Sequence, residues 1–117
     1  MLVDWALAYD ALNQPDLALA KLRQAAQMEA TGHVYSQIGM VYAKRSQWTE
    51  ALEALATAEK LEPNFPATQL YRGKIYIATN QPALAVASLQ RAVALDPGLA
   101  EARQELARAQ QMMRAGK

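Results

Sequence analysis

His33 is the only histidine of the 117-residue chain, so it is the first candidate for acid–base or metal chemistry. It follows a Thr-Gly pair where a helix is expected to begin, and no carboxylate stands at ligand spacing from it. We therefore interpret it as a solvated residue of a first helical turn. Ser36, Ser46 and Ser88 lack a histidine positioned by motif, and glycine-rich phosphate-binding motifs are absent. The sequence predicts no catalytic, metal or cofactor site.

Paired carboxylates are the other common machinery of catalysis, and one predicted helix is rich in glutamate. Glu50, Glu53, Glu59 and Glu62 fall on or near one face of that helix, with Lys60 among them. Mixed charges on one helical face are typical of a solvated surface. We read these residues as ordinary solvation and predict that the chain is not an enzyme.

Composition narrows the remaining classes of function. Twelve basic residues against eleven acidic ones leave the chain nearly neutral, so neither a nucleic-acid partner nor an anionic membrane surface is predicted. No apolar run approaches the roughly 18 residues of a membrane-spanning helix, so membrane insertion is not expected. The absence of cysteine excludes disulfides and thiolate metal sites. The first residues lack the basic region of a signal peptide, which slightly favours the cytoplasm and leaves the compartment open.

A sequence segment near the start of the chain is repeated near its end. Residues 13–26 read NQPDLALAKLRQAA, and residues 80–93 read NQPALAVASLQRAV. A third version, SQWTEALEALATAEKLEP, occupies residues 46–63, and it precedes the last copy by 34 residues, as the pairs Ala51 and Ala85 or Pro63 and Pro97 show. Each copy has apolar residues at helical spacing in an alanine-rich background, so each predicts a helix.

The start of each copy predicts a junction between two helices. Pro15 and Pro82 stand where the second helix begins, a position at which proline loses no intrahelical hydrogen bond. Asn13 and Asn80 stand just past the preceding helix, where a left-handed backbone is often required and asparagine is the best choice after glycine. Ser46 takes this place in the middle copy.

Another short helix is predicted upstream of each copy. Residues 34–45 and 69–80 align with the same offset of 34, and residues 2–13 fit the same pattern. A 34-residue repeat of two helices is the signature of a repeat protein, and here the chain resembles the tetratricopeptide repeat (TPR) family. The resemblance is carried by Tyr35, Ile38, Gly39, Tyr42, Ala51, Leu55, Ala58 and Pro63, and again by Gly73, Tyr76, Ala85, Leu89, Ala92 and Pro97.

The resemblance implies an all-α fold. It would be a right-handed superhelix, an α-solenoid of antiparallel pairs with about seven helices, because each pair buries its apolar face only against the next pair. We expect one domain over residues 1–117, with repeats at about 1–31, 32–65 and 66–99 and a capping helix at 99–115. Because the chain opens inside a predicted helix, we expect it to be an excised piece or to continue upstream.

Packing positions follow from the same spacing. Gly39, Gly73 and Ala6 are small, which predicts close helix crossings, and the tyrosines and tryptophans are expected to be core residues. The second helices should bury one apolar face, and the last helix a narrow apolar stripe. The residues concerned are Leu17, Ala18, Leu22 and Ala25, then Leu84, Ala85, Leu89 and Ala92, and finally Leu99, Ala102, Leu106 and Ala109.

In the TPR family the first helix of each pair lines a concave groove. The resemblance therefore implies a groove surface that is apolar in its middle and positive in its later part. In the alternative, Leu7, Leu70 and Ile77 pack between helices and the cations are only solvated. The predicted groove residues are Leu7, Met40, Lys44, Leu70, Tyr71, Lys74, Ile77 and Arg108.

Two functions of different class fit this pattern. The first is a non-catalytic scaffold or adaptor whose groove binds a protein or peptide with apolar anchors and an acidic group. The second is a structural or assembly module that stacks with further repeats or forms a homodimer through an uncapped N-terminal face at Leu2, Trp5 and Leu17. In TPR modules that bind chaperone C-termini, Lys and Asn line the first helix, whereas Val3 and Leu7 stand in those places here.

Overall fold

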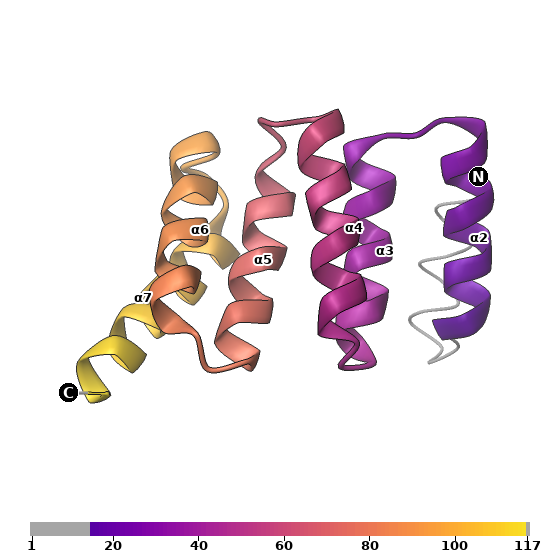
Figure 1. The fold of residues 1–117 in the computed structure, drawn as a ribbon. Helices are drawn as coiled ribbons and strands as arrows, with labels where there is room; N and C mark the ends of the chain where they lie inside the picture. The colour runs from indigo at the N-terminus through magenta and orange to yellow at the C-terminus, as the bar shows by residue number, and fades with distance from the viewer. Residues whose placement is uncertain (1–14, 117) are drawn as a thin grey trace. The chain divides into compact units, whose positions relative to one another are not determined.

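The structure of the protein is a computed structural model that describes residues 15–116, in which helices are joined by short turns and no strand occurs. The predicted all-α fold is thereby confirmed, and none of the described helices is long and apolar enough to cross a membrane. The chain divides into two compact units, residues 1–63 (unit 1) and 64–117 (unit 2). The helices are α2 (Pro15–Met28), α3 (Gly32–Lys44) and α4 (Trp48–Leu61) in unit 1, and α5 (Pro66–Ala78), α6 (Pro82–Leu95) and α7 (Ala100–Ala115) in unit 2 (Figure 1).

The helix pairs α3–α4 and α5–α6 repeat each other. Their four starts and ends differ by 34 residues throughout, as the sequence offset predicts. The junctions match as well, because Ser46 and Asn80 both have a left-handed backbone, with φ of 60° and 57°. Pro15 and Pro82 begin helices as expected. Asn13 lies outside the described residues.

Each pair is held by a glycine facing a leucine across the helix crossing. A Cβ atom placed on Gly39 would lie 2.9 Å from Leu55 Cγ and 3.1 Å from the Ala51 carbonyl oxygen. A Cβ atom on Gly73 would collide with the side chain of Leu89. The two leucines are fully buried, so they have little space to retreat. The predicted close crossings are confirmed at both glycines, and Ala6 lies outside the described residues.

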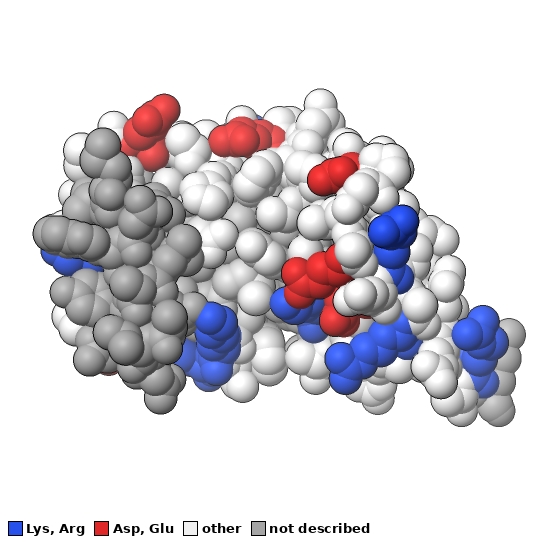
Figure 2. Space-filling view, turned by 180° about the vertical axis from the view of Figure 1, so that it is seen from behind, with Lys and Arg blue, Asp and Glu red and all other residues white. Residues whose placement is uncertain are grey.

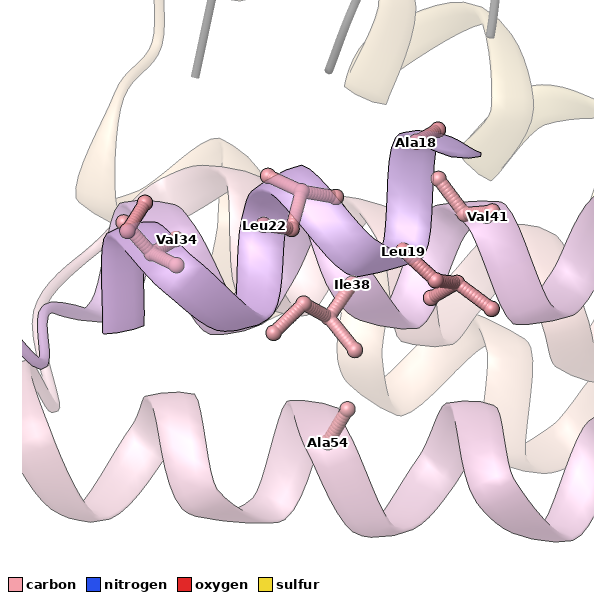
Figure 3. Close-up of a cluster of buried hydrophobic side chains, with 8 residues drawn as sticks. Ala18, Leu19, Leu22, Val34, Ile38, Val41 and Ala54 are labelled. Carbon is pink, nitrogen blue, oxygen red and sulfur yellow. The ribbon is translucent and has the colours of Figure 1, made fainter. Parts of the chain in front are cut away.

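The core of unit 1 forms between α2 and α3, with a contribution from α4. Leu19 and Leu22 of α2 pack with Ile38 and Val41 of α3 in a cluster whose members are at least nine-tenths buried (Figure 3). Burying one such side chain contributes about 1.5–3 kcal/mol. Leu17 was expected on the same face, but it is 48% exposed. It precedes the buried Ala18, and successive helical residues point about 100° apart, so Leu17 is turned away from the core.

The core of unit 2 forms between all three of its helices. Leu89 and its alanine neighbours on α6 pack against Ala102 and Ala109 of α7, and Leu99 and Leu106 lie against the same cluster. The predicted apolar stripe of the last helix is therefore confirmed. Leu84 was also expected in this core, but it is 49% exposed for the reason that applies to Leu17.

The aromatic residues are less buried than the sequence suggested. Tyr35 and Tyr42 pack against the unit 1 cluster, and Tyr71 and Tyr76 against the unit 2 cluster, but all four are only partly buried. Trp48, at the start of α4, is also partly exposed. A large ring can cover a core of small alanines and leucines while its outer edge stays in solvent. These residues therefore form the rim of each core and leave aromatic surface available.

One predicted solvated glutamate has a structural role. The backbone N–H of Gly32 donates to Glu62 Oε1 at 2.9 Å, and Thr31 Oγ1 accepts from Val34 N at 3.1 Å. Both acceptors serve the first turn of α3, whose N–H groups have no intrahelical partner. The interpretation of Glu62 as ordinary solvation is therefore wrong. Its carboxylate joins the end of α4 to the start of α3.

Candidate functional site

The predicted groove residues fall in two units, and each unit is considered alone. Met40 is partly buried and Lys44 is exposed on α3 of unit 1. Unit 2 holds the larger group on α5, together with Arg108 on α7. Leu7 lies outside the described residues.

Unit 2 presents part of its predicted surface and buries the rest. Leu70 is 3% exposed within the core cluster, so its side chain serves packing and is not accessible to a ligand. This follows the alternative in which Leu70 packs between helices. Tyr71 and Ile77 touch the same cluster but stay partly exposed. Lys74 stands three residues from each of them, and residues three apart are neighbours on a helix surface. We refer to Tyr71, Lys74, Ile77 and Arg108 as the α5–α7 face.

The cations of the α5–α7 face have acidic neighbours that sequence reasoning missed. Lys74 Nζ lies 2.7 Å from Glu101 Oε2, which joins α5 to the first turn of α7. Arg108 lies 4.0 Å from Glu105 on its own helix. Figure 2 shows acidic and basic side chains next to one another on the C-terminal part of the chain. The sequence predicts only the pair of Glu105 and Arg108, through their three-residue spacing. The pair of Lys74 and Glu101 depends on how two helices are aligned.

A second surface, absent from the predicted set, lies in unit 1. A pocket of about 470 Å³ is lined by residues of α2, α3 and α4. Figure 3 shows the side chains of Ile38 and Ala54, two of its lining residues, pointing toward one another. We call it the α2–α4 pocket. It is lined by Arg23, Ala26 and Gln27 of α2, Tyr35, Ile38 and Tyr42 of α3, and Glu50, Glu53, Ala54 and Thr57 of α4.

The α2–α4 pocket combines aromatic, apolar and charged groups. Arg23 Nη2 of α2 donates to the hydroxyl of Tyr42 on α3, so this hydrogen bond links two of the helices that line the pocket. Glu50 and Glu53 are three residues apart, so they stand on one face of α4. That spacing, together with the seven-residue spacing of the two tyrosines, was the sequence signal that could have located the pocket.

Neither surface holds a group of three potential metal ligands. Within residues 15–116, no three His, Asp or Glu side chains are grouped so that they could hold a metal ion. His33 lies exposed in the first turn of α3, as expected. The two surfaces are thus suited to contact through packing, hydrogen bonds and charge.

Comparisons with known proteins identify the repeat. A model of the tetratricopeptide repeat family matches residues 66–109. Three solved structures have the same fold: the first TPR of Spaghetti (RPAP3) bound to the HSP90 peptide SRMEEVD, the second TPR domain of human RPAP3 in complex with the HSP70 peptide SGPTIEEVD, and the Sgt2 TPR domain from Aspergillus fumigatus.

The structural likeness extends over nearly the whole chain. The first RPAP3 domain is 18% identical with a TM-score of 0.86, and the match covers 97% of this chain and 90% of that one. The second is 18% identical with a TM-score of 0.80, covering 92% and 90%. The Sgt2 domain is 14% identical with a TM-score of 0.90, covering 98% and 78%. No curated protein matches the chain. The family match over residues 66–109 and the fold agree with the 34-residue offset of the helices, and the chain has the fold of a tetratricopeptide repeat domain.

Proposed function

We propose that the chain is a non-catalytic protein-binding module, and that its α5–α7 face binds a protein segment with an acidic group and apolar anchors. The observation that carries the proposal is the position of Lys74 between two partly buried side chains, Tyr71 and Ile77, that keep some surface exposed. Burial of these side chains would supply most of the affinity, since partly exposed charges mainly orient a ligand. Arg108, which is 67% exposed, extends the positive charge along α7.

The ion pair between Lys74 and Glu101 is compatible with an acidic ligand. An ammonium group has three donors, so Lys74 can keep its contact with Glu101 and donate to a second carboxylate. The two side chains are 33% and 49% exposed, and such a pair contributes only about 0–1 kcal/mol. Glu101 would, however, repel the incoming carboxylate. This repulsion would lower the affinity for an acidic ligand, and a substitution that neutralises Glu101 would remove it.

The structural neighbours support the acidic character of the ligand. Both peptides held by the RPAP3 domains end in the sequence EEVD. At 18% identity this likeness supports the general mode of binding and does not transfer the partner. Val3 and Leu7 also stand where chaperone-binding modules carry Lys and Asn. We therefore propose an acidic segment without assigning it to a chaperone.

A peptide titration tests this proposal. The probe is SRMEEVD with a fluorescent label, compared with SRMQQVN, in which all three acidic side chains are neutral. We expect saturable binding of the acidic peptide alone. Lys74→Gln should weaken it several-fold, by up to about fivefold for loss of one exposed charge pair. Glu101→Gln should strengthen it.

Arg103→Gln is the matched control. Arg103 is exposed on α7 and lies two residues from Glu101, about 200° around the helix, so it points away from Lys74. Its loss should leave binding unchanged if the site is the α5–α7 face. Equal weakening by Arg103→Gln and Lys74→Gln would mean that general positive charge attracts the peptide, and the proposal would fail.

A further inference from the structure

The α2–α4 pocket of unit 1 has the properties of a binding site that the peptide-binding proposal does not use. Its volume of about 470 Å³ lies within the range of roughly 300–1,000 Å³ that is typical of ligand pockets. It is lined by three helices of one unit, so packing of that unit holds its shape. Ile38 and Ala54, both nine-tenths or more buried, form an apolar base on which the stem of a long side chain could rest.

Negative charge predominates among the residues that line the α2–α4 pocket. Two carboxylates, Glu50 and Glu53, stand on α4, whereas Arg23 is the one cation among the lining residues. Arg23 already donates to the Tyr42 hydroxyl. Within residues 15–116, the structure gives neither carboxylate a hydrogen bond or ion pair through its side chain. An arriving cation would therefore find acceptors that need not first give up a partner.

The tyrosines favour a cation further. Tyr35 and Tyr42 of α3 are partly exposed and line the pocket. A cation near the face of such a ring is attracted by about 0.5–1 kcal/mol at exposed sites and more when water is excluded. The aromatic, apolar and acidic residues that line the pocket thus favour the same kind of ligand, a cationic group at the end of an apolar side chain.

Geometry selects arginine among protein cations. Two glutamates one turn apart offer acceptors to a planar group with several donors, and a guanidinium both stacks on rings and forms paired hydrogen bonds with carboxylates. We propose that the α2–α4 pocket binds an arginine side chain of a partner protein. It would be a second contact site, which prefers a cation where the α5–α7 face prefers an acidic group. The pocket is formed by residues of unit 1 alone, so this proposal can be tested independently of the peptide-binding proposal.

An NMR titration of the isotope-labelled protein tests the pocket directly. The probe is the blocked tripeptide acetyl-Gly-Arg-Gly-amide, and its control contains citrulline, which has nearly the shape of arginine without its charge. We expect saturable amide shifts confined to α2, α3 and α4 with the arginine probe and much smaller shifts with citrulline. The lysine tripeptide should bind several-fold more weakly than the arginine one.

Substitutions locate the charge contact. Glu50→Gln and Glu53→Gln should each weaken binding by up to about fivefold. Glu29→Gln, an exposed acid of the same unit outside the pocket, should have no effect. Arg23→Gln should strengthen binding, because it removes a like charge. Circular dichroism of every variant confirms that the helices are intact.

Three results would overturn this inference. Equal binding of the citrulline probe would show that charge is not recognised. Equal weakening by Glu29→Gln and Glu53→Gln would reduce the contact to general attraction by an acidic unit. Tighter binding of acetyl-Gly-Glu-Gly-amide than of the arginine probe would mean that the pocket selects anions.

Discussion

The pair α3–α4 of unit 1 and the pair α5–α6 of unit 2 share helix bounds, glycine–leucine crossings and left-handed junctions, yet the two units differ in charge. Unit 1 carries eight acidic and five basic residues, and unit 2 carries three acidic and seven basic ones. The near neutrality of the whole chain hides this asymmetry. The positions that fix the fold are few, small and buried, and the exposed positions are free to give each unit its own partner chemistry.

The two pairs also differ in how their helix ends are closed. Gly32 opens α3 and donates its N–H to Glu62, whereas Pro66, its equivalent in unit 2, has no N–H to donate. Asp96, the equivalent of Glu62, instead accepts from Gly98 N at 3.1 Å within its own turn. The same repeat position thus links two helices in unit 1 and shapes a local turn in unit 2.

The largest expected effect comes from filling the crossing that both pairs share. Gly73→Leu should lower the free energy of unfolding by about 1–3 kcal/mol or more, because Leu89 is fully buried and cannot move aside. Gly98→Ala is the control, since its Cβ would meet only Asp96 Oδ1 at an ordinary 3.4 Å. Urea denaturation measures both. A Gly73→Leu variant as stable as the parent would contradict the close crossing.

The linking role of Glu62 should appear as a difference between the units. Glu62→Ala leaves the Gly32 N–H without its partner and should cost about 1 kcal/mol. Asp96→Ala should cost less, because the Gly98 N–H is exposed and water can replace the carboxylate. Thermal unfolding of the two variants provides the comparison. Equal losses would mean that the two residues act alike despite their different partners.

The limits of sequence reasoning follow from the same residues. A small residue at Gly39 and Gly73, the offset of 34 and the junction at Asn80 are local signals, so helices, crossings and turns were predictable. The contact between Lys74 and Glu101 was not, because it depends on the axial alignment of two helices 27 residues apart in sequence. The α2–α4 pocket was not predictable from the sequence for a related reason. Its ten lining residues come from three helices, and each helix alone has an ordinary amphipathic pattern.

Smaller effects are expected at the two left-handed junctions. A left-handed backbone costs a residue with a side chain about 1–2 kcal/mol, less for asparagine, and glycine avoids this cost while losing more chain entropy on folding. Ser46→Gly should therefore stabilise unit 1 by about 0.5–1 kcal/mol, and Asn80→Gly should stabilise unit 2 by less. Denaturation midpoints measure the order. A destabilised Ser46→Gly variant would show that the serine side chain contributes more than its backbone conformation costs.

The smallest effects concern two ion pairs that each link neighbouring helices within one unit. Arg45–Asp16 in unit 1 and Lys74–Glu101 in unit 2 both have N–O distances of 2.7 Å. Asp16 is 85% exposed but Glu101 only 49%, so water screens the first pair more. Double-mutant cycles with Asp16→Asn and Arg45→Gln, and with Lys74→Gln and Glu101→Gln, should give coupling energies of about 0.2 and 0.5 kcal/mol, both smaller at high salt.

The second coupling energy also bears on function. A ligand carboxylate can share Lys74 with Glu101 only if that ion pair is weak, so the proposed binding mode requires a small coupling. A value well above 1 kcal/mol would mean that Glu101 holds Lys74 too firmly for sharing. The positive charge offered to a ligand by the α5–α7 face would then come from Arg108, whose distance of 4.0 Å from Glu105 leaves its guanidinium more accessible.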